Sequence, residues 1–242
     1  MSDVGDGKRV LVTGGTSGIG AAIAREFALA GASMTVTGLT QSEVDAFIGA
    51  DEHSIAGCVL DVSDEVSVAE LVGSFDRLDV LVNCAGTILR DGQEFDPELF
   101  ARVLDVNLTG TMRLCVACRP LLAESRGCIV NTASMLTFFG SGFVPAYSAS
   151  KGGVAQLTKS LAIAWAAEGI RVNAVAPGWI ATAFTQPLLD DDERSQTVLS
   201  RTPLGRWGRP EDVAGAVCFL CSKTAAFITG VVLPIDGGYS IA

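Results

Sequence analysis

The sequence predicts an α/β fold, a doubly wound parallel sheet of about seven strands with helices on both faces. Short β-branched apolar runs alternate with helical patterns along the chain, which is typical of βαβ units with right-handed crossovers. The chain is 49% hydrophobic, and strands that are buried on both faces need such a composition. Its length of 242 residues suits one domain of this kind. We therefore expect a single domain over residues 1–242.

The strands are expected at the short runs rich in Val, Ile and Leu, with helices between them. The strand positions are residues 10–13, 34–37, 54–60, 78–82, 128–132, 170–176 and 231–235. The first helix is predicted at about residues 18–30, and the two longest at residues 97–123 and 146–168. Residues 177–209 look irregular and are rich in Pro, Gly and acidic residues. Because so long a loop in a compact domain is usually functional, we interpret it as a lid over a site.

The charge balance restricts the kind of partner. The net charge of −10 argues against nucleic acid and against an anionic membrane surface, since both attract basic proteins. No apolar run approaches the roughly 20 residues of a membrane helix, and the polar residues 1–9 lack a signal-peptide core. We therefore expect a cytoplasmic protein whose partner is a small molecule. A phosphate group remains possible, because a helix N-terminus can bind one without Lys or Arg.

The seven cysteines do not predict a disulfide framework or a metal site. Their number is odd, and no secretory signal is evident. Two CxxC pairs, Cys115 with Cys118 and Cys218 with Cys221, lie in apolar segments with a helical pattern. These segments lack the turn residues of a zinc knuckle. We expect these cysteines to behave as small buried apolar side chains.

A glycine-rich turn follows the first predicted strand and begins the first helix. Residues 13–20 read TGGTSGIG, so the spacing is G-x-x-x-G-x-G instead of GxGxxG. Glycines permit a tight turn here, and the last one lets the helix pack closely on the strand. The free N–H groups and the positive dipole end of the helix would face a pyrophosphate. The turn predicts dinucleotide binding on a Rossmann-type sheet, through Gly14, Ser17, Gly18, Ile19 and Gly20.

A second pattern predicts acid–base chemistry. Tyr147 and Lys151 are four residues apart at the start of a helix and so share one face. A free tyrosine has a pKa near ~10 and is a poor base at neutral pH, but a neighbouring ammonium and a helix N-terminus would both lower that pKa. Ser134 follows the fifth strand, at the sheet edge where ligands bind in open α/β folds. By itself, a chance pair on the surface with a serine upstream would explain the same residues.

With these motifs the chain resembles the short-chain dehydrogenase/reductase family over residues 9–239. The family's TGxxxGxG matches residues 13–20, and its PGxxxT matches residues 177–182. In its NNAG motif, Cys84 replaces the second Asn. The resemblance implies a bound nicotinamide cofactor. The further contact residues that it implies are Asp61, Val62, Asn83, Ala85, Gly86, Tyr147, Lys151, Pro177, Gly178, Ile180 and Thr182.

The resemblance also implies a mechanism. Tyr147 would exchange a proton with the substrate oxygen, and Ser134 would orient and polarise that oxygen. Lys151 would lower the pKa of Tyr147 and hydrogen-bond the nicotinamide ribose, while Asn107 would hold a proton-relaying water. The expected function is hydride transfer between NAD(H) and a secondary alcohol or ketone. A non-catalytic nicotinamide-binding regulator is a remote alternative, and the single histidine, His53, has no residues around it for a hydrolase triad or a zinc site.

The end of the second strand bears on the choice of cofactor. A carboxylate there selects NAD, and a cation favours NADP. The selecting position is Gly38, followed by Leu39, and neither is charged. Ser17 stands where relatives that use NADP often have a basic residue. We expect a site that lacks both the carboxylate and the cation, with NAD preferred and NADP not excluded.

For the substrate, the resemblance is greatest to the branch of 2-dehydro-3-deoxy-gluconate and gluconate 5-dehydrogenases. Arg90 is either a partner for a substrate carboxylate or a solvated loop cation. The apolar Phe138, Phe139 and Phe143 suit a polyol poorly, so an NADP-dependent 3-oxoacyl reductase or another ketone reductase is the alternative. The candidate substrate contacts are Arg90, Ser134, Phe139, Phe143 and Trp179. Relatives pair the two long helices across a dimer axis, which implies a homotetramer.

Overall fold

The structure, a computed structural model, describes residues 4–51 and 53–242. In this part of the chain seven parallel strands form one sheet in the order β3-β2-β1-β4-β5-β6-β7. Each predicted strand is present, with its ends within two residues of the expected positions. The strand bounds are β1 Arg9–Thr13, β2 Ser33–Gly38, β3 Ile55–Val59, β4 Val80–Asn83, β5 Cys128–Thr132, β6 Arg171–Pro177 and β7 Val232–Ile235. Residues 1–3 of the polar N-terminal segment, and Glu52 beside His53, lie outside the described residues.

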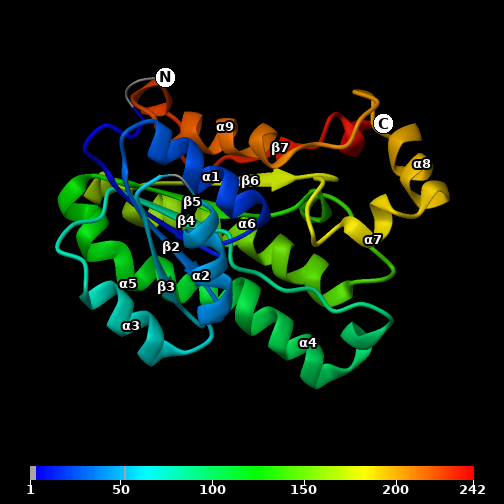
Figure 1. Ribbon diagram of the computed structural model, residues 1–242, viewed down its shortest axis with the longest axis horizontal. Coiled ribbons are helices and arrows are strands. Elements are labelled where there is room, and N and C mark those ends of the chain that lie inside the picture. Colours follow the sequence, from blue (N-terminus) through cyan, green and yellow to red (C-terminus); the bar gives the residue numbers. More distant parts are fainter. Residues whose placement is uncertain (1–3, 52) are drawn as a thin grey trace.

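Helices cover both faces of the sheet (Figure 1). Helices α1 (Gly18–Leu29), α2 (Gln41–Ala50) and α9 (Pro210–Cys221) lie on one face, and α3 (Glu65–Gly73), α5 (Gly110–Ser125) and α6 (Pro145–Trp165) on the other. Successive side chains of a strand point to opposite faces. In β1, Val10 and Val12 join the core under α1 and α9, whereas Leu11 joins the core under α5 and α6. Burial of each such side chain stabilises the fold by about 1.5–3 kcal/mol.

The predicted helix at residues 97–123 has the expected extent but not a uniform geometry. Helix α4 (Pro97–Leu104) continues into α5 through a π-helical turn at Asp105–Thr109. In this turn the Gly110 N–H donates to the Asp105 carbonyl, five residues back. Such turns often occur at functional positions, and Asn107 lies within this one. The other long helix, α6, ends in a 3₁₀ turn at Ala166–Glu168.

The expectation that residues 177–209 are irregular is wrong in part. This segment contains α7 (Gln186–Leu189) and α8 (Asp192–Ser200). The Asp191 side chain accepts a hydrogen bond from the Arg194 N–H and so caps α8. Acidic residues that suggest a loop by composition act here as helix-start residues. Both helices lie beyond the carboxyl end of β6 (Figure 1).

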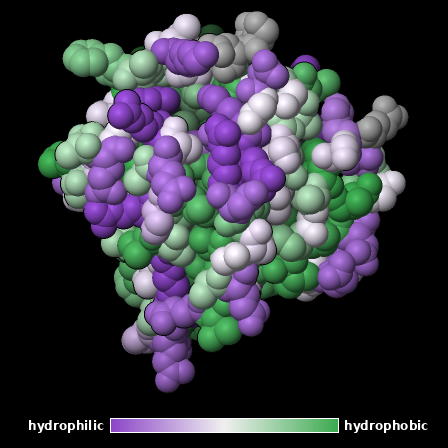
Figure 2. Space-filling model, turned by 90° about the vertical axis from the view of Figure 1, so that its left-hand side faces the viewer, coloured by the Kyte–Doolittle hydropathy of each residue, from purple (hydrophilic) through white to green (hydrophobic). Residues whose placement is uncertain are grey.

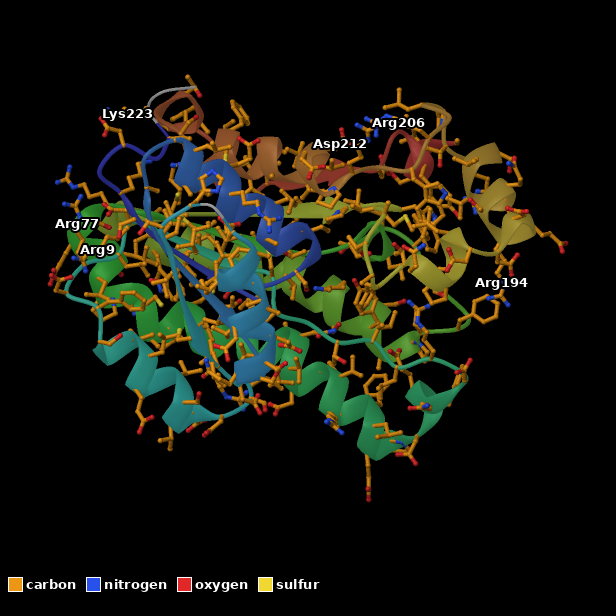
Figure 3. The ribbon with its side chains drawn as sticks, in the orientation of Figure 1. Arg9, Arg77, Arg194, Arg206, Asp212 and Lys223 are labelled. Atoms are coloured by element: carbon orange, nitrogen blue, oxygen red, sulfur yellow. The ribbon has the colours of Figure 1, made fainter. Side chains whose placement is uncertain are left out.

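The opposite end of the molecule is the amino-terminal edge of the sheet. Figure 2 shows hydrophilic residues spread over this end, with hydrophobic ones between them. Arg9, Arg77 and Lys223 lie here, far from Arg194 and Arg206 beside α8 and α9 (Figure 3). Among the described residues, no helix combines the length and the apolar character that a membrane crossing requires. The four CxxC cysteines are buried as free thiols in α5 and α9.

Candidate active site

The carboxyl ends of β1 and β4 meet at the point where the strand order reverses, which is where open α/β sheets bind ligands. Gly14 has a φ of +62°, and a Cβ on it would lie 2.8 Å from the Cα of Ala85, in the loop after β4. A Cβ on Gly20 would lie 2.2 Å from the Gly14 carbonyl oxygen. Only glycine fits at these two positions, which therefore allow the first turn, the loop after β4 and helix α1 to approach one another.

The residues of this turn fit the pyrophosphate of a dinucleotide. Helix α1 begins at Gly18 without a side-chain cap, and its first turn carries no acidic residue. The N–H groups and the positive end of the helix dipole are therefore free to bind an anion. Gly18 has a φ of +50°, and a Cβ there would lie 3.3 Å from Cγ2 of Thr182. The TGxxxGxG and PGxxxT segments, more than 150 residues apart in the chain, thus face each other across this space.

Ser134, Tyr147 and Lys151 come together beside the ends of β5 and β6. Ser134 begins a 3₁₀ turn (Met135–Thr137), and its Oγ accepts from the Leu136 N–H at 3.2 Å. Its hydroxyl is near enough to the Tyr147 phenol to act on the pKa of that phenol. Lys151 Nζ lies 5.5 Å from the centre of the Tyr147 ring and donates to the Thr132 carbonyl at 2.6 Å. The predicted catalytic group is thus assembled in space.

The pKa values of these groups differ from the expectation. Burial raises the pKa of Tyr147 to about 12, although the Ser134 hydroxyl acts in the opposite direction; the charge of Glu94 raises it further. Burial also lowers the pKa of Lys151 to about 8. Tyr147 as a residue keeps some exposed surface, but its hydroxyl is enclosed, so burial dominates. The expected lowering of the tyrosine pKa by Lys151 is not found in this arrangement, in which the ammonium group donates to Thr132 instead.

Asn107 joins the loop after β4 to helix α6. It is buried, and its Oδ1 accepts from the Thr87 N–H at 2.7 Å. Its Nδ2 donates to the Thr87 carbonyl at 2.9 Å and to Ser150 Oγ at 3.0 Å. Gly86 leaves the space in front of it, since a Cβ there would lie 3.3 Å from Asn107 Oδ1 and 3.8 Å from Lys151 Nζ. The π turn therefore places the Asn107 amide between the loop after β4 and α6, next to Gly86.

Glu94 is a site residue that the sequence did not indicate. It is 1% exposed, and its Oε1 accepts from the Leu89 N–H at 3.0 Å. Its Oε2 accepts from the Tyr147 N–H at 2.9 Å, in the first turn of α6. The carboxylate thus fixes the start of the helix that carries Tyr147 and Lys151. An acidic residue in a polar loop normally indicates a solvated side chain, so no signal in the sequence would have revealed this one.

Some of the other expected cofactor contacts lie at the carboxyl edge of the sheet, and others lie in the protein interior. The Asp61 carboxylate accepts from Ser63, whose hydrogen bonds lower the pKa of Asp61, and Val62 is buried beside Gly110. Pro177 ends β6, Gly178 follows it, and Ile180 is buried. Asn83 is turned inward, where Nδ2 donates to Asn131 Oδ1 at 2.9 Å. This bond joins β4 to β5, while Asn83 Oδ1 is buried without a hydrogen-bond partner among the described residues.

The end of β2 differs from the expectation in one respect. Gly38 is uncharged and Leu39 is 60% exposed, but a carboxylate is present at this turn. Glu43, in the first turn of α2, accepts from the Leu39 N–H at 2.8 Å and from the Thr40 N–H at 3.4 Å through Oε2. A Cβ on Gly38 would lie 3.1 Å from Thr16 and 3.2 Å from Glu43. The expectation that this end of the sheet lacks a carboxylate is therefore wrong.

Apart from Phe143, the remaining expected substrate contacts lie in two places, one beside Tyr147 and one around Tyr239. Arg90 Nη2 donates to the Phe184 carbonyl at 2.7 Å, and its guanidinium lies 5.6 Å from the Phe184 ring centre. That ring lies 6.4 Å from the Tyr147 ring, so Arg90 contacts the part of residues 177–209 that lies beside Tyr147.

The second group surrounds Tyr239, whose ring contacts Phe139 at 6.1 Å and Trp179 at 6.2 Å. Trp179 also lines a cavity of about 220 Å³ with Arg206 and Asp212, and these two form an ion pair where α9 begins (Figure 3). Phe143 is 83% exposed and belongs to neither group.

Comparison with known proteins identifies the family. A family model described as enoyl-(acyl carrier protein) reductase matches residues 14–240. The chain is 43% identical to 2-dehydro-3-deoxy-D-gluconate 5-dehydrogenase of Bacillus subtilis (strain 168), over 96% of this chain and 94% of that protein. The chain belongs to the short-chain dehydrogenase/reductase family. As a member of this family, it is an NAD(P)-dependent oxidoreductase that acts on CH–OH groups.

Two other short-chain dehydrogenases bear on the site. Cis-4-hydroxycyclohexanecarboxylate dehydrogenase of Sinomonas cyclohexanicum is 41% identical, over 95% of this chain and 95% of that protein. The structure of a gluconate 5-dehydrogenase from Burkholderia cenocepacia J2315, in complex with NADP and tartrate, is 32% identical with a TM-score of 0.91. That comparison covers 98% of this chain and 96% of the other.

Proposed function

We propose that Tyr147 exchanges the proton with the substrate oxygen, that Ser134 orients this oxygen, and that Lys151 binds the nicotinamide ribose. The supporting observation is that Ser134, Tyr147 and Lys151 are gathered in one place, with Lys151 Nζ 5.5 Å from the centre of the Tyr147 ring and the Ser134 hydroxyl acting on the pKa of the phenol. With a pKa of about 12, the phenol is protonated at neutral pH and is ready to donate to a carbonyl. The nicotinamide, when bound, supplies or accepts the hydride. Asn107, already bonded to Thr87 and Ser150, would hold the relay water.

The adenosine and pyrophosphate would lie on the Gly14–Gly20 turn, with Asp61, Val62, Ala85 and Gly86 along the neighbouring strand ends. Residues 177–209 would act as the lid. Their connection to Arg90 at one end, and the Arg206–Asp212 ion pair at the other, are contacts by which a lid is held over a site. The lid begins with the PGxxxT segment. Its residues Pro177, Gly178, Ile180 and Thr182 would contact the nicotinamide half of the cofactor.

We propose that the substrate is a secondary alcohol, or the matching ketone, that also carries a carboxylate. Arg90 supports this: it lies next to Phe184, whose ring neighbours Tyr147, and a guanidinium has five N–H donors for a carboxylate. The similar proteins named above act on a sugar acid and on a hydroxycyclohexanecarboxylate. The second of these substrates combines a carboxylate with an apolar ring, which suits the apolar Phe138 and Phe139.

A substrate panel with both cofactors tests this proposal. 2-Dehydro-3-deoxygluconate, gluconate, cis-4-hydroxycyclohexanecarboxylate, its neutral amide and a 3-oxoacyl thioester would be compared by kcat/KM. We expect a carboxylate substrate to exceed its amide by roughly tenfold or more, the size of a charge-assisted hydrogen bond. Arg90→Gln should remove that difference; because Arg90 also bonds the Phe184 carbonyl, the rate with the amide should fall as well, but less than the rate with the acid. A thioester that exceeds all the acids, or an equal loss for acid and amide in Arg90→Gln, would contradict the proposal.

We further propose that NAD is preferred over NADP, and that the preference is determined at the turn after β2. A 2′-phosphate carries nearly two negative charges and cannot be buried cheaply without a cationic partner. Leu39→Arg should supply that partner and raise kcat/KM with NADP, relative to NAD, by about tenfold through a charge-assisted contact. Leu39→Gln, which is polar but neutral, is the matched control and should leave the ratio within about twofold. A wild-type preference for NADP of tenfold or more would show that another cation reaches the pocket.

The assembly is proposed to be a homotetramer in which α5 and α6 pair with their copies in a second subunit. Val116 on α5 is 49% exposed and Ile163 on α6 is 81% exposed, and apolar side chains in such positions favour an interface. Light scattering at micromolar concentration should give four times the chain mass of 25.1 kDa. Ile163→Asp should lower that mass if the α6 face forms a contact. A wild-type mass of one chain would contradict the proposal.

A further inference from the structure

The Glu43 carboxylate lies at the turn where the second strand ends. Its Oε2 accepts from the backbone N–H of Leu39 at 2.8 Å and from that of Thr40 at 3.4 Å. The Thr40 hydroxyl accepts in return from the Glu43 N–H at 3.3 Å, so the two residues form a capping box for α2. A capping box explains why the helix begins here. It does not explain what the negative charge does to a ligand at this turn.

The surroundings of Glu43 indicate which part of a ligand its charge would meet. A hollow of about 410 Å³ opens between the glycine-rich turn and α2, and its lining includes Thr16, Ser17, Glu43 and Phe47. Thr16 and Glu43 meet over Gly38, since a Cβ on this glycine would be within 3.2 Å of both. A side chain at the usual selecting position would therefore compete for space with Thr16 and Glu43. The carboxylate is provided from α2 instead of from the end of β2.

Arg25 is the cation among the lining residues of this hollow, and its charge is already compensated. Its Nε donates to Asp51 Oδ2 at 2.7 Å, and the Asp51 side chain is 1% exposed. The guanidinium also stacks over the Phe47 ring, 5.1 Å from its centre. Because Asp51 accepts from the His53 backbone as well, it is held in place. Moving Arg25 towards a second anion would take a charged partner away from the buried Asp51 carboxylate, whose other side-chain contact is His53 Nδ1 at 2.9 Å.

We propose that Glu43 determines cofactor choice by reading the 2′ position of the adenine ribose, an inference that rests on the proposed seat of the cofactor on the Gly14–Gly20 turn. A free 2′-hydroxyl donates a hydrogen bond to the carboxylate. A 2′-phosphate meets a like charge, and it finds the Leu39 and Thr40 N–H groups already occupied by the carboxylate. Glu43 therefore acts as an internal anion that fills the place of the phosphate.

The test measures cofactor binding without turnover. The dissociation constants of NAD and NADP are determined by calorimetry for the wild type, Glu43→Gln and Asp45→Asn. Glutamine keeps an oxygen for the Leu39 N–H and is accepted in a capping box, so the fold is retained; a thermal melt verifies this. Asp45→Asn is the matched control, since it makes the same charge change on the same helix, where the Asp45 side chain bonds Gln41.

In Glu43→Gln the affinity for NADP relative to NAD should rise by about five- to tenfold, the size of a partly screened charge repulsion, and less at high salt. In Asp45→Asn the ratio should stay within about twofold of the wild type. The proposal is overturned if the ratio in Glu43→Gln stays within twofold, or if both variants shift it equally. A wild type that prefers NADP refutes the proposed NAD preference alone, because the effect of Glu43→Gln on the ratio is measured separately.

Discussion

Replacement of Tyr147 by phenylalanine is expected to lower kcat by roughly 100-fold or more, because it removes the proposed proton-transfer group. The ring packing against Phe184 is retained, and the glycine-rich turn is untouched. The dissociation constant of the cofactor should therefore change little. Steady-state kinetics together with cofactor titration of the ligand-free protein measure the two quantities separately.

The matched control is Tyr239→Phe, since Tyr239 is the other tyrosine of the chain and also packs in an aromatic cluster. It should keep most of the wild-type rate. A Tyr147→Phe enzyme with more than roughly a few percent of the wild-type kcat would mean that another group moves the proton. A large loss of cofactor affinity would instead show that the phenol mainly supports binding.

Replacement of Lys151 by methionine should have two opposite effects: turnover falls by roughly 100-fold or more, and the ligand-free protein becomes more stable at pH 7. Burial lowers the pKa of Lys151 from 10.5 to about 8, a shift that corresponds to a cost of about 3 kcal/mol for keeping the charge buried. Loss of the hydrogen bond to the Thr132 carbonyl offsets about 1 kcal/mol of this. A net gain of roughly 1–2 kcal/mol in the free energy of unfolding is expected.

The pKa shift of Lys151 also determines how the stability of the protein changes with pH. Between about pH 8 and 10.5 the unfolded chain binds the Lys151 proton more tightly than the folded protein does, so this group adds stability as the pH rises. The advantage of Lys151→Met should thus be full below pH 8 and should shrink towards pH 10. Urea unfolding at pH 7 and pH 10 measures it, with Lys159→Met, an exposed lysine of the same helix, as control. A variant that is less stable than the wild type at pH 7 would contradict the account.

The regular part of the fold could be predicted because parallel strands have a strong apolar signature. All seven strand positions followed from the apolar pattern, and the meeting of Ser134, Tyr147 and Lys151 followed from the family resemblance that the motifs carry. The two acidic site residues could not be predicted in the same way. Glu94 is buried only because Leu89 and Tyr147 present their N–H groups to it, and Glu43 reaches the end of β2 from a different element. Both depend on three-dimensional placement that a local pattern does not contain.

The pKa shifts of Tyr147 and Lys151 could not be predicted from the sequence either. The YxxxK spacing correctly placed Lys151 near Tyr147, but the direction of the pKa change depends on burial. Both groups are enclosed, so the neutral form is favoured for each. The helices within residues 177–209 were missed for another reason, since Pro187 and a run of acidic residues hide two short helices that the Asp191 cap and neighbouring contacts stabilise.

The π turn at Asp105–Thr109 makes the chain sensitive to a change of length. One residue of an α-helix corresponds to a rotation of about 100°, and the wider turn takes up about one extra residue locally. Removal of a single residue here would close the turn to regular α geometry and leave Leu114, Cys115 and Cys118 against the sheet that buries them. It would, however, shift Asn107 relative to Thr87 and Ser150, to which its side chain is bonded. The extra residue of this turn thus serves the position of one amide and not the packing of the helix.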